Sequence, residues 1–243
     1  MQIKDSIALV TGANRGIGRA LTQALIQAGA AKVYASARDP QQLQSLVAEG
    51  QGKVVALQLD VTEPAQIERA AASASDVTLL FNNAGVWASG SVLSSDRAEL
   101  ERDLAINYFG ALAVTRAFLP ALERARKAAV VNILSVVSLA AMPAMGGYSA
   151  SKAAASSMTQ ALRGELAARS IDVHAVFPGP IDTDMTREVE MPKTSPTVTA
   201  RAIVAAVEAG QLDIFPDPMS QGVHETWSKN PAEVVRQFSG MVG

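Results

Sequence analysis

The chain has 243 residues, of which 49% are apolar and 18% charged, and its 21 basic and 23 acidic side chains give a net charge of −2. This composition excludes a disordered or collagen-like chain, and the small charge argues against a nucleic-acid partner, which needs a concentrated basic surface. The absence of cysteine excludes disulfides and thiolate chemistry, and with only two histidines we expect no metal site. The length suits one α/β domain, which we expect to span residues 1–243.

Neither of two apolar segments has the pattern of a targeting or membrane sequence. Met1–Val10 contains only four consecutive apolar residues, so we expect no signal peptide. The segment Ala128–Ser151 has no charged residue, but polar residues, Pro143 and two adjacent glycines interrupt it, which a membrane-spanning helix tolerates poorly. We therefore expect a soluble, cytoplasmic protein with no membrane partner.

Short apolar runs alternate with longer amphipathic patterns along the chain. Continuous apolar runs indicate strands buried on both faces, and intervening helices indicate parallel pairing. We therefore predict an α/β fold with a doubly wound parallel sheet of about seven strands and helices on both faces. The predicted strands are Ile7–Thr11, Lys32–Ala37, Val54–Leu59, Val77–Phe81, Ala129–Leu134, Val173–Phe177 and Leu212–Phe215. The predicted helices are Arg19–Gln27, Gln41–Ala48, Glu63–Ala74, Arg97–Leu119 (ended by Pro120), Ser149–Arg169 and Thr197–Ala209.

The first predicted strand leads into Thr11–Gly18, which contains three glycines. Glycine lets the backbone turn tightly and approach a diphosphate, and the N-terminus of the following helix attracts negative charge. A parallel sheet binds ligands at the carboxyl ends of its strands, so we predict a dinucleotide site here. The spacing, Gly-x₃-Gly-x-Gly, differs from the commoner Gly-x-Gly-x₂-Gly.

A second motif, Tyr148 with Lys152, lies at the start of a predicted helix. The i, i+4 spacing places a phenol and an ammonium group on one helix face, and the ammonium lowers the pKa of the phenol toward working pH. Such pairs often occur by chance on solvated helices. This pair, however, follows an uncharged segment and lies thirteen residues after Ser135, a spacing that favours Ser135 over Ser138 as its partner. We predict that Tyr148 acts as a general acid and base.

In combination, these motifs resemble the short-chain dehydrogenase/reductase family, and in particular its compact, NADP-preferring carbonyl reductases. The resemblance runs from Ile7 to about Met185 and implies a Rossmann fold. It also implies a catalytic tetrad in which Tyr148 exchanges a proton with the substrate oxygen and Ser135 orients that oxygen. Lys152 would hold the nicotinamide ribose and lower the Tyr148 pKa, and Asn107 would hold a water molecule for proton relay.

The same resemblance implies the cofactor contacts. They come from the glycine motif, the ends of later strands and the Asn-Asn-Ala-Gly element, which in the family also steadies the sheet. The implied residues are Gly12, Asn14, Arg15, Gly16, Ile17, Gly18, Arg38, Asp60, Val61, Asn83, Ala84, Gly85, Tyr148, Lys152, Pro178, Gly179, Ile181 and Thr183.

The end of the second predicted strand distinguishes the two nicotinamide cofactors. An NAD site carries a carboxylate there to bind the ribose 2′-hydroxyl, whereas this chain has Ala37 followed by Arg38. A guanidinium group binds a 2′-phosphate, and Arg15 adds a second cation, so we predict NADP(H). NAD(H) is the alternative if the strand extends far enough for Asp39 to take the acidic role, instead of capping the next turn.

Apolar residues predominate around the predicted catalytic tyrosine, and a short substrate lid is expected at about residues 180–196. No cation in this set could pair with an anionic substrate, although Arg187 and Lys193 lie nearby in the lid. We therefore predict NADPH-dependent hydride transfer to a neutral apolar ketone, or the reverse reaction of a secondary alcohol. The predicted pocket residues are Val86, Trp87, Val137, Met142, Met145, Met185 and Met191.

Two other functions fit parts of the pattern: an NAD-dependent alcohol dehydrogenase, and a non-catalytic NADP-binding sensor or scaffold, which the complete tetrad disfavours. A sugar-nucleotide epimerase needs a longer C-terminal domain. The C-terminal tail differs from the family's usual ending, which packs against a neighbouring subunit. We therefore predict a homodimer through the helices that carry Asn107 and Tyr148, with a tetramer as the alternative.

Overall fold

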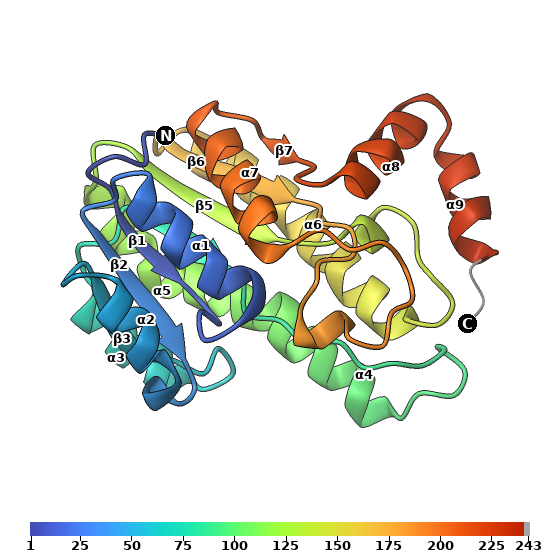
Figure 1. The fold of residues 1–243 in the computed structure, drawn as a ribbon, viewed down its shortest axis with the longest axis horizontal. Coiled ribbons are helices and arrows are strands. Elements are labelled where there is room, and N and C mark those ends of the chain that lie inside the picture. The colour runs from blue at the N-terminus through green and yellow to red at the C-terminus, as the bar shows by residue number, and fades with distance from the viewer. Residues whose placement is uncertain (241–243) are drawn as a thin grey trace.

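Seven parallel strands form one sheet in the order β3-β2-β1-β4-β5-β6-β7 (Figure 1). The structure is a computed structural model that describes residues 1–240. Chain order reverses between β1 and β4, and crossing helices join the strands, so the predicted doubly wound sheet is confirmed. The strands are β1 (Ile7–Val10), β2 (Lys32–Ala37), β3 (Val54–Gln58), β4 (Leu79–Asn82), β5 (Ala128–Ile133), β6 (Ile171–Val176) and β7 (Asp213–Ile214).

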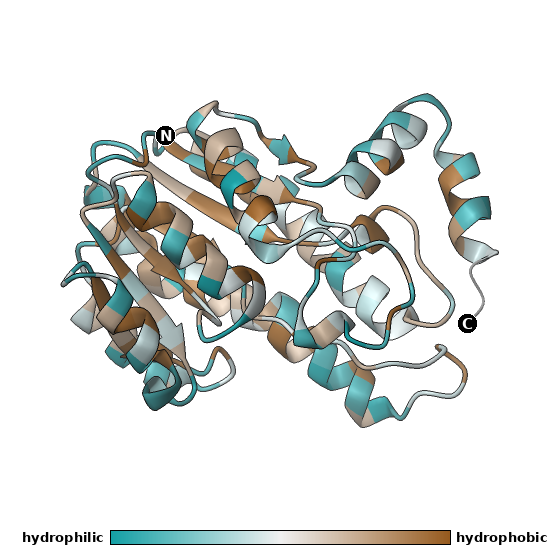
Figure 2. Ribbon diagram, viewed as in Figure 1, coloured by the Kyte–Doolittle hydropathy of each residue, from teal (hydrophilic) through white to brown (hydrophobic). Residues whose placement is uncertain are grey.

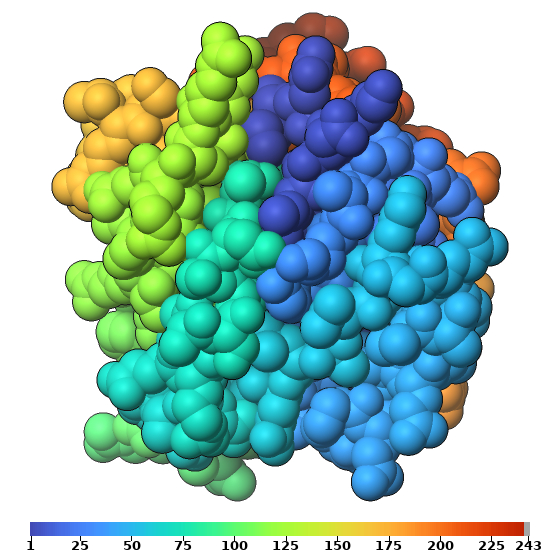
Figure 3. Space-filling model, turned by 90° about the vertical axis from the view of Figure 1, so that its left-hand side faces the viewer, coloured from blue at the N-terminus to red at the C-terminus, as the bar shows by residue number. Residues whose placement is uncertain are grey.

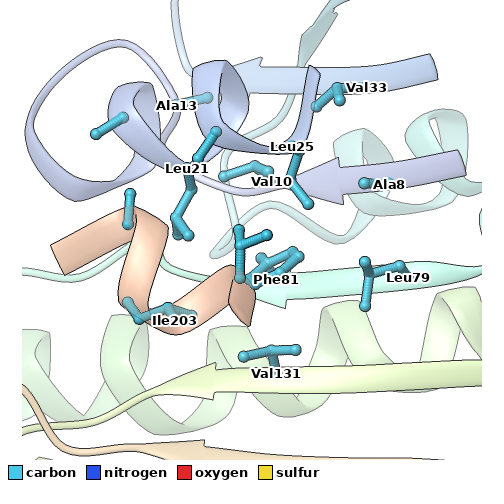
Figure 4. Close-up of a cluster of buried hydrophobic side chains, with 14 of the residues drawn as sticks. Ala8, Val10, Ala13, Leu21, Leu25, Val33, Leu79, Phe81, Val131 and Ile203 are labelled. Atoms are coloured by element: carbon cyan, nitrogen blue, oxygen red, sulfur yellow. The ribbon is translucent and has the colours of Figure 1, made fainter. Parts of the chain in front are cut away.

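Helices cover both faces of the sheet and bury separate apolar clusters. On one face, α1 and α7 pack Leu21, Leu25 and Ile203 against Val10 and Phe81 (Figure 4). Helices α3, α5 and α6 bury the other face, and the brown interior of the ribbon follows the strands (Figure 2). The helices are α1 (Gly16–Gln27), α2 (Gln44–Glu49), α3 (Pro64–Ser73), α4 (Arg97–Leu104), α5 (Ala111–Arg124), α6 (Gly146–Ala167), α7 (Pro196–Glu208), α8 (Pro218–Lys229) and α9 (Pro231–Ser239), with short helical turns η1 (Pro40–Leu43), η2 (Ala105–Gly110), η3 (Val136–Ser138) and η4 (Asp184–Thr186).

The segment Arg97–Arg124 forms one continuous run of α4, the π-helical η2 and α5. The predicted stop at Pro120 is wrong, because α5 continues to Arg124 and buries Ala121 and Leu122 beyond the proline. Proline forfeits one helical hydrogen bond there, and apolar burial of the last turn offsets that loss. By length and composition alone this run could cross a membrane, but Val114 and Phe118 pack on the sheet.

The last two helices, α8 and α9, form a hairpin beside the carboxyl end of the sheet (Figure 1, red). The sequence analysis predicted no helix after residue 209, so this hairpin is an addition to the predicted fold. The opposite side of the molecule is formed by blue and cyan segments of the first third of the chain, beside green segments (Figure 3). The two ends of the fold are thus built from different parts of the sequence.

Candidate active site

The glycine motif forms a tight turn between β1 and α1. Gly12 and Gly16 have φ values of +65° and +54°, a backbone region that other residues rarely adopt. A Cβ atom on Gly18 would lie 2.3 Å from the Gly12 carbonyl oxygen and 2.5 Å from the Asn83 side-chain nitrogen. Gly18 therefore lets α1 pack directly behind the turn. Gly12 and Gly16 line the cavity, and a Cβ atom on either would stand 3.0 Å from Ala84 or 3.1 Å from Thr183.

The Asn-Asn-Ala-Gly element holds the turn against β4. The Thr11 hydroxyl accepts hydrogen bonds from the backbone nitrogens of Asn83 and Ala84, both at 2.9 Å. The Asn83 amide donates to the Thr11 carbonyl at 2.8 Å, and the buried Asn82 amide donates to Asn132 on β5. These bonds join adjacent strand ends into one rigid edge.

A cavity of about 780 Å³ runs along this edge of the sheet. Every residue predicted to contact the cofactor lines it, except Gly18, which lies behind the turn. Ser135, Tyr148 and Lys152 line the same cavity. Residues on its wall that the sequence reasoning did not assign to the site are Gln42, Leu59, Thr62, Ile106, Ile133, Leu134, Asp184 and Thr186.

Tyr148 and Lys152 lie on the first turns of α6, which the uncharged loop after β5 delivers to the cavity. The Lys152 Nζ atom lies 5.7 Å from the centre of the Tyr148 ring and donates a 2.8 Å hydrogen bond to the Ile133 carbonyl. Burial raises the pKa of Tyr148 to about 12, and interaction with the Ser135 hydroxyl opposes this shift. Burial lowers the pKa of Lys152 to about 8. Burial dominates, so the lowered Tyr148 pKa that the sequence analysis predicted from Lys152 is not found here.

Asn107 lies in the π-helical turn between α4 and α5, and such bulges are frequent at functional sites. Its side-chain oxygen accepts from the Val86 nitrogen at 3.0 Å, while its amide donates to the Val86 carbonyl and to Ser151, both at 2.9 Å. The side chain therefore joins α6 to the segment after β4. It does not line the cavity itself.

Two cations lie on the cavity wall, Arg38 directly after β2 and Arg15 in the glycine turn. The strand ends at Ala37, as predicted, and Arg38 and Arg15 both line the cavity. Asp39 caps η1, because its carboxylate accepts from the Gln41 nitrogen at 2.9 Å. Its carboxylate is therefore engaged in the local turn, the role preferred from the sequence.

The lid from residue 180 to 196 closes on itself and touches the glycine turn. Its two ends pair through Ile181 and Thr194, and Asp184 lies 3.4 Å from the Arg15 guanidinium. Of the seven predicted pocket residues, Val86 and Met185 line the cavity. The Trp87 ring lies 6.3 Å from the Tyr148 ring, and Met191 is half-buried in the lid.

The remaining predicted pocket residues, Val137, Met142 and Met145, pack against the C-terminal hairpin. They form one apolar cluster with Tyr148 and with residues of α8 and α9. The hairpin residues of this cluster are Met219, Val223, Trp227, Val234 and Phe238. The hairpin is therefore a wall behind Tyr148, contributed by the same chain.

Asp217 fastens the hairpin to the cavity and was missed by sequence reasoning. It is buried at the N-terminus of α8, where one carboxylate oxygen accepts from the Ser220 nitrogen and the other from the Gly179 nitrogen at 2.8 Å. The signal was present, because Asp-Pro followed by Ser is a capping pattern for a helix start. A stack of Phe177, Phe215 and His224 anchors the same helix to β6 and β7.

Comparisons with known proteins agree with this geometry. The family model described as short chain dehydrogenase matches residues 6–194. The chain is 34% identical over 220 residues to the 3-oxoacyl-(acyl-carrier-protein) reductase FabG of Escherichia coli, a match that covers 87% of this chain and 86% of that protein. It is likewise 34% identical over 196 residues to the FabG of Thermotoga maritima, covering 78% of this chain and 79% of that protein.

Two solved structures extend the comparison to the C-terminal region. A short chain dehydrogenase from Burkholderia cenocepacia in complex with NADP has a TM-score of 0.92 and 38% identity, with 100% of both chains covered. A short chain dehydrogenase/reductase from Burkholderia phymatum in complex with NAD has a TM-score of 0.84 and 25% identity, covering 95% of this chain and 98% of that one. Fold, motifs and relatives agree: the chain belongs to the short-chain dehydrogenase/reductase family of oxidoreductases.

Proposed function

We propose that this protein is an NADPH-dependent reductase of neutral, apolar ketones. One observation carries the proposal: a phenol, an ammonium group and a hydroxyl, on Tyr148, Lys152 and Ser135, meet in the cavity that the glycine turn also lines. A site with both a dinucleotide turn and a proton donor suits hydride transfer to a carbonyl.

The cavity fits a dinucleotide with a 2′-phosphate. Gly12 and Gly16 leave the turn without side chains where a diphosphate would lie, at the N-terminus of α1. Arg15 and Arg38 would hold the 2′-phosphate, because no acidic side chain follows directly on Ala37 and Asp39 is engaged in a cap. The relative crystallised with NADP is the more similar of the two solved structures described above.

The protein's own groups would supply the proton and the orientation. When bound, the reduced nicotinamide supplies the hydride that attacks the carbonyl carbon. Ser135 donates a hydrogen bond to the carbonyl oxygen and orients it, and that oxygen takes the proton of the Tyr148 hydroxyl as the C=O double bond becomes an alcohol. The Lys152 ammonium favours the phenolate that is left, and Asn107 holds the segment around Val86 against α6.

The substrate class follows from charge near the catalytic tyrosine. Residues 180–196 contain four acidic and two basic side chains, and Arg187 pairs with Asp184 at 2.6 Å. The apolar cluster of the hairpin supplies no cation. This surrounding favours a neutral aryl or cyclic ketone over a keto acid or a sugar. A 3-oxoacyl thioester is the second candidate, because the E. coli and T. maritima relatives are reductases of that class.

We further propose that the active form is a cytoplasmic homodimer that pairs through α5 and α6. A groove of about 350 Å³ lies between these helices and is lined by apolar residues that include Leu112, Leu119 and Leu162. The neighbouring Phe109 is 59% exposed. Light scattering should show a dimer, whereas a monomer at micromolar concentration would contradict this assembly and a stable tetramer would require a second interface.

The direct test is a screen of NADPH and NADH oxidation against a panel of neutral ketones, keto acids and 3-oxoacyl thioesters. The proposal predicts consumption of NADPH, with a neutral ketone as the preferred substrate, and consumption about 10²–10⁴-fold slower in the Tyr148→Phe variant. Preferred use of NADH would contradict the assignment of Arg38. Faster turnover of a 3-oxoacyl thioester would favour the second candidate.

A further inference from the structure

A carboxylate that belongs to no recognised motif lies next to the catalytic pair. Asp103, in α4, is fully buried. Its Oδ2 atom accepts a hydrogen bond from the Ala88 nitrogen at 3.2 Å, and within residues 1–240 its Oδ1 atom has no hydrogen-bond partner. Burying a half-satisfied carboxylate is costly, and such departures from good packing are expected at functional sites.

The packing of α4 on α6 brings Asp103 close to the catalytic tyrosine. Its Oδ2 atom lies 3.9 Å from the point where a Cβ atom on Gly147 would stand, and Gly147 directly precedes Tyr148. A side chain at position 147 would overlap Leu100 of α4, so the glycine lets α4 pack closely on α6. The glycine therefore keeps the carboxylate near the start of α6.

Asp103 and Asn107 lie one helical turn apart, and both form hydrogen bonds to the backbone of the segment after β4. Asp103 accepts from the Ala88 nitrogen, and Asn107 bonds both backbone groups of Val86, so together they hold the segment between them. That segment contains Trp87, whose ring lies against Tyr148. Asp103 thus helps to fix the wall opposite the proton donor.

Three charged side chains act on the Asp103 carboxylate. On α4 they are Glu99, which raises the Asp103 pKa, and Arg102, which lowers it; on α6, Lys152 also lowers it, and the segment 86–90 contributes no titratable group. Burial is the main cause that raises the pKa of Asp103 itself. In return, the negative charge of Asp103 raises the pKa of both Tyr148 and Lys152.

We propose that Asp103 is a positioning residue that biases this site toward carbonyl reduction: its carboxylate keeps Tyr148 as a phenol and Lys152 as an ammonium ion, and holds the segment around Trp87 in place. The inference rests on the proposed function. Reduction needs the phenol, which gives its proton to the carbonyl oxygen. Alcohol oxidation needs the phenolate, which removes the alcohol proton and which a neighbouring negative charge disfavours.

The test compares Asp103→Asn with the wild type. The asparagine removes the charge but keeps an oxygen that accepts from the Ala88 nitrogen. We expect the pH midpoints of kcat/KM, for ketone reduction with NADPH and for alcohol oxidation with NADP⁺, both to fall by about one pH unit, the effect of one nearby charge inside a protein. Glu101→Gln, an exposed carboxylate two residues away, should leave both profiles unchanged.

A second readout does not depend on activity. In the cofactor-free protein, an NMR titration of the Lys152 side chain, assigned with Lys152→Met, should give a midpoint near 8 in the wild type and a lower one in Asp103→Asn. Asp103→Leu removes both the charge and the acceptor, so it should show the same shift and a raised ketone KM as well.

Unmoved midpoints in folded Asp103→Asn, by kinetics and by NMR, would overturn the inference, and so would a uniform loss of activity at every pH without a shift. A lowered Lys152 midpoint in a protein that reduces no carbonyl would instead contradict the proposed function, while the electrostatic role of Asp103 would stand. The two failures are therefore distinguishable.

Discussion

The two ends of the cavity are built in different ways. At the glycine turn, the shape depends on backbone: Gly12 and Gly16 adopt positive φ values, and Gly18 allows close packing, all within one βα connection. Behind Tyr148, beyond the residues that line the cavity, side chains from distant segments pack together, where Val137 and Met142 meet Val234 and Phe238 of α9. The first end depends on one short segment, whereas the second depends on contacts between segments far apart in the chain, and we propose that the second selects the substrate.

The largest effect is expected where the two ends meet. Tyr148→Phe removes the proposed proton donor, so carbonyl reduction should fall by about 10²–10⁴-fold, the range of general acid catalysis. The dissociation constant of NADPH should change little, because the glycine turn is untouched. Steady-state kinetics and fluorescence titration measure the two quantities, and near-wild-type turnover would refute the proposed role of Tyr148.

The hairpin should affect stability and substrate but not the nucleotide. Phe238→Ala removes a fully buried ring, so the free energy of unfolding should fall by about 3–5 kcal/mol and the ketone KM should rise. Val235→Ala, exposed on the same helix, is the matched control. If Phe238→Ala weakened NADPH binding as strongly as ketone binding, the separation of the two ends would be wrong.

The nucleotide end should show the opposite pattern. Arg38→Ala removes a charge-assisted contact that is worth roughly 1.5–3 kcal/mol, so NADPH should bind about tenfold to more than a hundredfold more weakly. NADH binding and protein stability should stay close to those of the wild type. Calorimetric titration measures this, with the exposed Lys53→Ala as control. Equal losses for both nucleotides would place the 2′-phosphate elsewhere.

The pH profile follows from the buried lysine. The Lys152 pKa lies below its ordinary value of 10.5, at about 8, so the ammonium ion is present at lower pH and disappears as pH rises. We expect kcat/KM for reduction to be level below pH 8 and to fall about tenfold for each pH unit above it, since one proton is lost. A profile that stays level up to pH 10 would contradict this assignment.

Structural features that depend on short segments could be predicted from the sequence. The doubly wound parallel sheet and the end of β2 at Ala37 follow from local pattern, and the fold confirms both. Ser135, Tyr148 and Lys152 of the predicted tetrad line one cavity, whereas Asn107 does not. Asp39 could be interpreted correctly because a carboxylate before proline commonly caps a turn.

Other features could not be derived from local pattern. The burial of Asp103 depends on how α4 packs on α6, and nothing in its neighbouring residues marks it as internal. The helices of the hairpin were indicated in the sequence by the Asp217 cap and by the spacing of Val234 and Phe238 on one helix face. The contact of the hairpin with residues 136–145 was not indicated, because it joins segments about a hundred positions apart. The helix end predicted at Pro120 was wrong because apolar packing of the last turn outweighs the hydrogen bond that the proline loses.

The central claim is that the hairpin and the lid select a neutral ketone, while the glycine turn binds NADPH. It is tested most directly by kcat/KM, with NADPH, for a neutral aryl ketone and for its matched keto acid. The account predicts that the neutral ketone is the better substrate, because Lys152, the cation beside Tyr148, is bonded to the Ile133 carbonyl and the hairpin side chains that pack near Tyr148 are apolar. If the keto acid were preferred by more than about tenfold, or about 1.4 kcal/mol, a cation must face the site and the account would be contradicted, with Arg187 the first residue to replace.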